Sequence, residues 1–139
     1  MIKAIAQETP MGCAIACIAS ILNKSQSSII KDSGLNVEKS WNHGYYCGEI
    51  VRILKNNGRR YKFSKVTEKT KHLIDKDRSI VFVKGKNERV GHYLVRDKLN
   101  NRWMESWINF PKMNPAKAGF VKKLPDTPRW VIYEGGRNP

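Results

Sequence analysis

The spacing of apolar residues changes once along this chain, near residue 58, and that change limits the folds that it can adopt. Upstream, apolar residues recur with the period of a helix, and downstream they alternate or run together as they do in strands. Helices are predicted over residues 12–23, 26–32 and 45–57, and strands over residues 61–66, 79–83, 92–95, 102–107 and 129–133. Helices first and strands afterwards predict an α+β fold with the two kinds of element in separate layers.

Capping and turn residues support the predicted ends of these helices and strands. Ser25 is a favourable first cap for the second helix, and Asn57-Gly58 is a favourable end for the third. We expect residues 68–77 to form a short polar helix or loop. The proline-rich residues 111–128 predict an irregular connection before the final strand.

The length and composition favour one soluble domain. The chain has 139 residues, 40% hydrophobic and 27% charged, so we expect a single globular domain over residues 1–139. No apolar run approaches the roughly 18 residues that a membrane span requires. The apolar stretch at residues 11–22 follows a polar segment rather than the basic segment of a signal peptide. With only three cysteines as well, we expect a cytoplasmic protein. The sequence does not indicate an oligomeric state.

Lysine and arginine outnumber aspartate and glutamate by 26 to 12, which leaves a formal net charge of +14. The excess is spread along the chain, so any attraction for an anionic partner belongs to the folded surface. An acidic polypeptide and a nucleic acid are both compatible with this charge. Nucleic-acid binding or cleavage is therefore an alternative function, in which basic pairs contact phosphates and exposed aromatic rings stack on bases. The aromatic residues considered for stacking are Tyr45, Tyr46, Trp103 and Trp107.

Cys13 is the candidate nucleophile. It follows Gly12 and stands where the first helix is expected to begin. Unpaired backbone N–H groups and the positive end of the helix dipole favour a thiolate at such a position. Cys17, one turn further into the apolar helix, has no such advantage and is interpreted as a core residue.

A cysteine nucleophile needs a base, a group that orients the base and donors for an oxyanion. His92, at the start of a predicted strand, is the candidate base. Glu105 lies on the next strand and Asn109 just beyond it, and either could orient the imidazole. Gln7 precedes Cys13 by six residues in an extended segment that could bring its amide beside the thiol.

The order and spacing of these residues resemble the papain-like cysteine peptidases, most closely the bacteriocin-processing, double-glycine leader peptidases and their stand-alone relatives. In that family a glutamine precedes the nucleophile by six residues, as in Gln7-Glu-Thr-Pro-Met-Gly-Cys13, and a helix of small residues follows. A helix ended by glycine and an apolar strand then precede the histidine strand. The resemblance covers most of the chain and implies a papain-like fold, with an N-terminal helical layer on an antiparallel sheet.

The resemblance also implies roles for these residues. Gln7 would donate to the oxyanion, Cys13 would attack and His92 would act as the base. The family's third catalytic residue is an aspartate, usually followed by proline, on the strand after the histidine, and this chain has none there. We favour Glu105 for that role and keep Asn109 as the alternative.

Gly12 and Ala14 flank the cysteine where the family usually has an acidic residue and a glycine. The implied activity is a cysteine hydrolase that cleaves a peptide or amide bond through an acyl-enzyme. Deconjugases and acyltransferases use the same residues, so the sequence does not choose between water and another acceptor. The expected substrate is a polypeptide, and the chemistry requires no cofactor or metal.

A zinc site is the alternative for the same cysteines. Cys13, Cys17, His43 and Cys47 together offer enough ligands for tetrahedral zinc. Structural zinc ligands usually lie on turns, however, and the first two cysteines lie in a helix that is apolar nearly all round. We therefore favour the nucleophile over the metal site.

Overall fold

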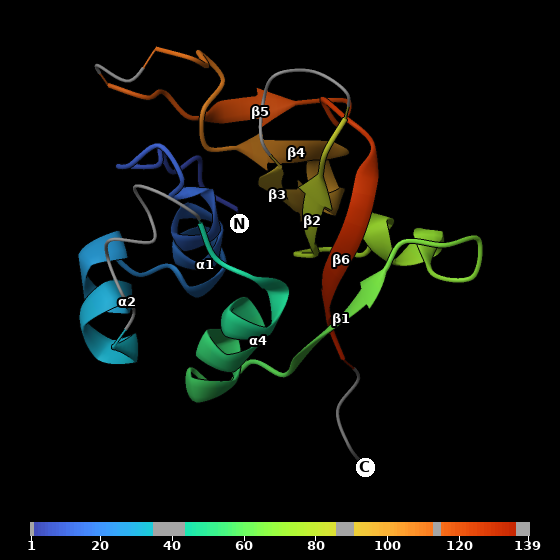
Figure 1. The fold of residues 1–139 in the computed structure, drawn as a ribbon, viewed down its shortest axis with the longest axis horizontal. Coiled ribbons are helices and arrows are strands. Elements are labelled where there is room, and N and C mark those ends of the chain that lie inside the picture. Colours follow the sequence, from blue (N-terminus) through green and yellow to red (C-terminus); the bar gives the residue numbers. More distant parts are fainter. Residues whose placement is uncertain (1, 35–43, 86–90, 113–114, 136–139) are drawn as a thin grey trace.

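The computed structural model describes residues 2–34, 44–85, 91–112 and 115–135. Within these ranges the protein has an α+β fold, with three α-helices and a six-stranded antiparallel sheet (Figure 1). The strands lie in the order β1-β6-β2-β3-β4-β5, so the last strand in the sequence is inserted between the first two. The α+β class predicted from the change of periodicity is confirmed.

The three helices occupy the predicted segments. They are α1 (Cys13–Leu22), α2 (Gln26–Ser33) and α4 (Cys47–Asn56). α2 begins after Ser25, whose hydroxyl accepts a hydrogen bond from the Ser28 backbone N–H at 3.2 Å, as its predicted cap requires. α4 begins two residues later than predicted, because Tyr45 and Tyr46 lie before the first turn.

The strands of the sheet are β1 (Tyr61–Lys65), β2 (Ile80–Val83), β3 (His92–Asp97), β4 (Arg102–Glu105), β5 (Gly119–Val121) and β6 (Pro128–Glu134). Two short 3-10 helices accompany them, η1 (Lys71–Asp75) and η2 (Lys98–Asn100). The segment 68–77, predicted as a short helix or loop, therefore contains η1.

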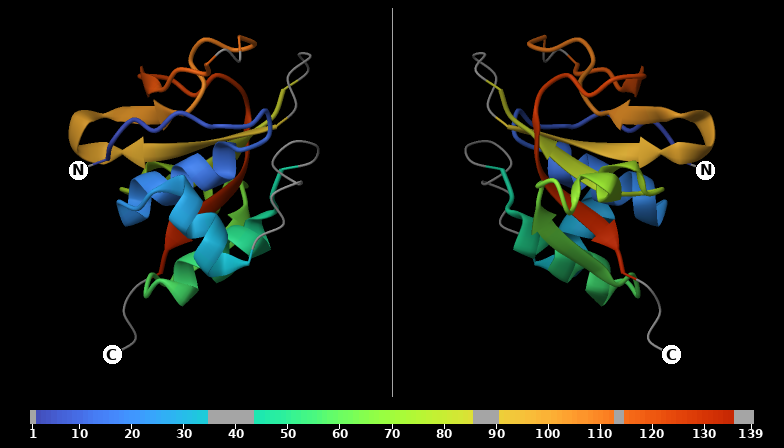
Figure 2. Two further views of the ribbon diagram at one scale, coloured as in Figure 1. Left: turned by 90° about the vertical axis from the view of Figure 1, so that its left-hand side faces the viewer. Right: turned by 90° about the vertical axis from the view of Figure 1, so that its right-hand side faces the viewer.

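The sheet is covered on both faces. The helices gather on one side of it (Figure 2), where α1 and α4 pack on buried residues of five strands, among them Ile80, Val95, Met104 and Ile132. Partly buried residues of η1 and the loops cover the other face, where the buried strand residues are Val81, Val83, Leu94, Trp103 and Val131. Because both faces are buried, β2 and β3 are nearly continuous apolar runs.

Three predictions about the strands are wrong in detail. β4 ends at Glu105 rather than at Trp107, because the chain turns from Ser106 onward. β5 lies inside the segment predicted to be irregular, because a three-residue edge strand is too short to show a periodicity. Alternation along the strand predicted over residues 61–66 would bury Phe63 on the same face as Tyr61, but Phe63 is 46% exposed and packs beside Trp130.

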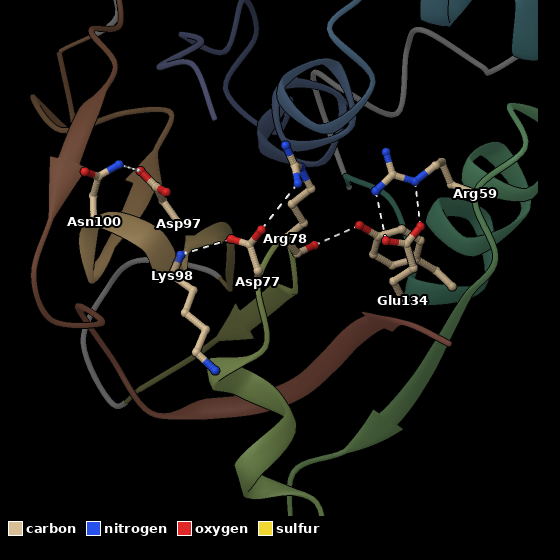
Figure 3. A network of polar contacts seen from close by, with 8 residues as sticks. Arg59, Asp77, Arg78, Asp97, Lys98, Asn100 and Glu134 are labelled. Atoms are coloured by element: carbon tan, nitrogen blue, oxygen red, sulfur yellow. Dashed lines mark hydrogen bonds and ion pairs between the residues drawn. The ribbon is translucent and has the colours of Figure 1, made fainter. Parts of the chain in front are cut away.

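Polar contacts join the ends of several strands (Figure 3). Arg59, just before β1, donates two hydrogen bonds to the carboxylate of Glu134 at the end of β6, at 2.6 and 2.9 Å. The Asp77 carboxylate accepts a hydrogen bond from the Lys98 backbone N–H at 3.1 Å, which ties the segment before β2 to the end of β3. These contacts join segments at the edges of the sheet that carries His92 and Glu105.

Among the described residues, no single helix has both the length and the apolar composition to cross a membrane. α1 and α2 meet those two criteria only when taken together, and they are bent by 100° at the break between them.

Candidate active site

Cys13 is the first residue of α1, and its side chain is only 6% exposed. Gly12 caps the helix. Since glycine has no side chain, no side chain at the cap accepts a hydrogen bond from the first N–H groups of the helix. The Cys13 sulfur is hydrogen-bonded to the imidazole of His92 and to the backbone of Tyr93. The predicted nucleophile and base are therefore in contact, although 79 residues separate them in the sequence.

His92 begins β3 and pairs with Val83 of β2, so its backbone is held in the sheet. Its side chain is 4% exposed. The imidazole Nε2 is hydrogen-bonded to the carboxylate oxygen Oε1 of Glu105. Since Nε2 is hydrogen-bonded to Glu105, Nδ1 is the ring nitrogen left to contact the Cys13 thiol.

Glu105, the last residue of β4, is the carboxylate that the structure places against His92. It is 3% exposed, and its Oε1 also accepts a hydrogen bond from the Trp107 backbone N–H at 3.2 Å. Asn109 lies elsewhere, in the following loop, where its side chain bonds the Pro115 carbonyl at 3.1 Å and the Lys117 N–H at 2.7 Å. Of the two residues considered for orienting the imidazole, Glu105 has the required position.

The pKa shifts of Cys13 and His92 both favour placing their shared proton on the imidazole. Burial alone would raise the pKa of Cys13, but the charge and hydrogen bond of His92 outweigh it, and the pKa is lowered. Burial would lower the pKa of His92, but Cys13 and Glu105 on its two sides raise that pKa to about 9. Both shifts favour a thiolate–imidazolium pair, with the Glu105 side chain on the other side of the imidazole.

Gln7 is buried beside the segment that leads to Cys13. Its Nε2 donates hydrogen bonds to the carbonyls of Thr9 and Pro10 at 2.9 and 3.0 Å. Its Oε1 accepts a hydrogen bond from the Ser106 hydroxyl at 2.8 Å, and its backbone N–H donates to the Ser106 carbonyl at 3.1 Å. Carbonyls can only accept, so these contacts fix which end of the amide faces the Cys13 loop.

Ser106 is a site residue that the sequence analysis missed. It is fully buried and directly follows Glu105, so one short segment holds both His92 and Gln7. No local pattern identified it, because a serine after a strand is common and its partner lies 99 residues away in the sequence.

The other two cysteines lie in different environments. Cys17 is fully buried, and burial raises its pKa well above the ordinary value. Its sulfur lies 3.5 Å from the Tyr93 carbonyl, as expected of a core residue. Cys47 is partly exposed at the start of α4, and burial raises its pKa as well.

The alternative zinc site depends on His43, which lies outside the described residues. Within the described ranges, no three histidine, cysteine, aspartate or glutamate side chains are grouped so that they could hold a metal ion. The Cys13 sulfur contacts the His92 imidazole instead.

The aromatic residues considered for stacking on nucleic-acid bases divide into two groups. Tyr45, Trp103 and Trp107 are buried, and Tyr46 is exposed. Trp107 packs edge-on against Phe110 and donates a hydrogen bond to the Lys112 carbonyl at 2.6 Å. Three of the four rings therefore belong to the core and the site rather than to a stacking surface.

Comparison of the chain with protein-family models and with curated proteins finds no match. The case for a functional site therefore rests on the contacts among Cys13, His92 and Glu105, with Gln7 held beside the Cys13 loop by Ser106. These contacts form a nucleophile paired with a base and a carboxylate behind the base, which is the arrangement that nucleophilic catalysis by cysteine requires.

Proposed function

We propose that this chain is a papain-like cysteine hydrolase that cleaves a peptide or amide bond. The observation that supports the proposal most strongly is the chain of contacts from the Cys13 thiol through His92 to Glu105. A core cysteine beside a core histidine needs no orienting group behind the imidazole, whereas an imidazole that must alternate between acid and base does, and buried Glu105 stands in that position here. Cys13, His92 and Glu105 are all buried, and they belong to α1, β3 and β4 respectively.

The reaction follows from these contacts. The Cys13 thiolate attacks the carbonyl carbon, a sulfur–carbon bond forms, and the carbonyl electron pair moves to oxygen. The His92 imidazolium gives its proton to the leaving nitrogen as the carbon–nitrogen bond breaks. Water then attacks the thioester carbon and gives a proton to His92, and the carbon–sulfur bond breaks. This releases the acid and restores the Cys13 thiolate beside the His92 imidazolium.

The oxyanion would be held by the Cys13 backbone N–H and the Gln7 amide. In this structure the Gln7 nitrogen donates to the Thr9 and Pro10 carbonyls, so donation to an oxyanion requires it to exchange one of those bonds. Ser106 keeps the amide oriented with its nitrogen toward the Cys13 loop in either case.

The net charge of +14 favours an acidic polypeptide as the substrate. If an acceptor other than water attacks the thioester, the same chemistry becomes acyl transfer. Hydrolysis and acyl transfer use the same contacts of the site. The proposed reaction uses only protein side chains and water.

Alkylation of the cysteines tests the proposal. Iodoacetamide is added near neutral pH to the unaltered protein, to His92→Ala and to His72→Ala, and the rate at each cysteine is followed by peptide mapping. We expect Cys13 to react fastest and His92→Ala to slow it at least about tenfold, since losing the imidazole raises the pKa of the thiol. His72 is exposed, so its replacement serves as the matched control. Equal rates at Cys13 and Cys17, indifferent to His92, would contradict the proposal.

A further inference from the structure

An aromatic cavity of about 450 Å³ opens between the start of α4 and the sheet. Eight residues line it, and six are aromatic: Tyr45, Tyr46, Phe63, Phe82, Tyr93 and Trp130. Its inner wall is buried, since Tyr45 and Tyr93 are each 5% exposed. Its rim is open to solvent, since Tyr46, Phe63 and Trp130 are 72%, 46% and 36% exposed. Four separate strands and one helix contribute to this cavity, which the proposed reaction does not use.

Two walls of the cavity continue directly into the Cys13 site. Tyr93 lines the cavity, and its backbone is hydrogen-bonded to the Cys13 sulfur. Tyr45 follows Gly44, and a Cβ added to Gly44 would lie 3.5 Å from the Met11 carbonyl, two residues before the nucleophile. Tyr93 therefore connects the cavity to the Cys13 sulfur.

The cavity is held open by contacts among its own walls. The Tyr93 hydroxyl donates a hydrogen bond to the Tyr45 carbonyl at 2.9 Å, which joins β3 to the segment before α4. The Phe82 and Tyr93 rings pack with their centroids 4.9 Å apart, and the Phe63 and Trp130 rings pack at 6.1 Å. Because these rings are fixed by each other, an incoming group finds a wall that is already ordered.

We infer that this cavity receives an aromatic side chain of the substrate that is bound at Cys13, an inference that rests on the proposed function. Rings that meet at tilted angles offer faces and edges to another ring, and burying a large apolar side chain is strongly favourable. A glycine would leave the cavity unfilled. A cationic group is disfavoured, since Lys65 pairs with Trp130 across the β1–β6 ladder and the chain as a whole is basic.

Gly48 offers a way to fill the cavity without a clash. It lines the cavity as the second residue of α4, and a Cβ added to it meets nothing within 4 Å. Gly48→Leu should therefore occupy the space intended for the substrate ring. Asn56→Leu adds the same side chain at an exposed position of the same helix and is the matched control.

Tripeptidyl chloromethyl ketones test the inference, because they label an active cysteine without a known substrate. The Cys13 sulfur forms a bond to the methylene carbon and chloride leaves with its electron pair, so no other reactant is needed. One probe carries glycine throughout, three carry phenylalanine at one position each, and a matching set carries leucine. The rate of labelling at Cys13 is measured by peptide mapping for the unaltered protein, Gly48→Leu and Asn56→Leu.

We expect phenylalanine at one position to label Cys13 at least about tenfold faster than the all-glycine probe, and faster than leucine at that position. Gly48→Leu should bring the ratio of the phenylalanine rate to the glycine rate close to one, and Asn56→Leu should leave the ratio unchanged. Thermal unfolding of each variant shows that the fold is kept.

Equal labelling by glycine and phenylalanine probes, or by leucine and phenylalanine probes, would overturn the inference and leave the proposed enzyme intact. So would a phenylalanine preference that persists in Gly48→Leu. Protection of Cys13 by a short single-stranded RNA, without any preference among the peptides, would assign the cavity to a nucleobase instead. If no probe labels Cys13 faster than Cys17, the proposed function itself fails, and the inference fails with it.

Discussion

At the scale of single residues, side chains from three elements determine whether the proton shared by Cys13 and His92 lies on the sulfur or on the imidazole. Cys13 comes from the start of α1, His92 from the start of β3 and Glu105 from the end of β4. Glu105 holds the imidazole at Nε2, which leaves Nδ1 to face the sulfur. The Trp107 backbone N–H holds the same carboxylate oxygen, so the orientation of His92 depends on the turn after β4.

Glu105→Gln is expected to slow the labelling of Cys13 by iodoacetamide at least about tenfold near neutral pH. The amide keeps the shape of the side chain but removes the negative charge that helps to raise the pKa of His92. Asn109→Ala should change the rate little, because Asn109 bonds only within its loop in the contacts seen here. Peptide mapping of the two variants measures both rates, and the reverse order of effects would move the orienting role to Asn109.

The pH dependence of labelling should separate Cys13 from Cys47. The pKa of Cys13 is lowered, so its thiolate persists and labelling continues as the pH falls below the ordinary thiol range. The pKa of Cys47 is raised by burial, so its labelling should begin only at higher pH. In His92→Ala, burial and the Glu105 charge both raise the pKa of Cys13 and only the Tyr93 backbone contact lowers it, so the Cys13 profile should move to higher pH. A Cys13 profile that coincides with that of Cys47 in the unaltered protein would contradict the ion pair.

At the scale of elements, the β2–β3 pair carries both the base and a wall of the aromatic cavity. Phe82 of β2 lies opposite Tyr93 of β3, and Gly91 precedes His92. A Cβ added to Gly91 would lie 1.8 Å from the end of the Phe82 ring, so the ring occupies the space that any other residue would need. Gly91 therefore allows the ring to pack beside the strand that presents His92.

Gly91→Ala is expected to lower the free energy of unfolding by about 1–3 kcal/mol, the usual range for overpacking a well-filled site. The displaced Phe82 ring should also slow labelling of Cys13, because β2 and β3 would shift together. Gly48→Ala is the control, since its added methyl meets open space and removing a helical glycine stabilises by about 0.5–1 kcal/mol. Thermal or urea unfolding measures both changes. An unchanged stability in Gly91→Ala would show that the ring is free to move aside.

At the scale of the whole molecule, the net charge of +14 must be balanced by a partner, by substrate or by counterions. Among the described residues, the titratable groups that act on the Cys13–His92 pair are these two side chains and Glu105, and no lysine or arginine is among them. The basic surface and the buried ion pair are therefore separate features of this protein, and they respond to different conditions.

Salt should distinguish the two features. Buried pairs are screened little, so the labelling of Cys13 by uncharged iodoacetamide should change less than about twofold between 50 and 200 mM salt. Binding of an acidic peptide or of a nucleic acid, followed by fluorescence anisotropy, should weaken steeply over the same range. Labelling of Cys13 that falls in parallel with binding would show that the site depends on the surface charge.

The sequence by itself determined the order of helices and strands, the Ser25 cap of α2 and the placing of Cys13 at the start of a helix. Periodicity and capping depend on residues within a few positions of each other, so they can be read along the chain. The short edge strand β5 and the exposure of Phe63 could not be predicted in this way, because both depend on which strands pair and on how the sheet twists.

Only the tertiary structure decided which residues meet. The choice between Glu105 and Asn109 depends on where β4 ends, and the Ser106 contact with Gln7 spans 99 residues. The aromatic cavity draws on four strands and the start of α4, none of which is marked as a cavity wall in its own sequence. Such contacts follow from strand register and from the packing of α1 on β3, which depend on the whole chain at once rather than on any one segment of it.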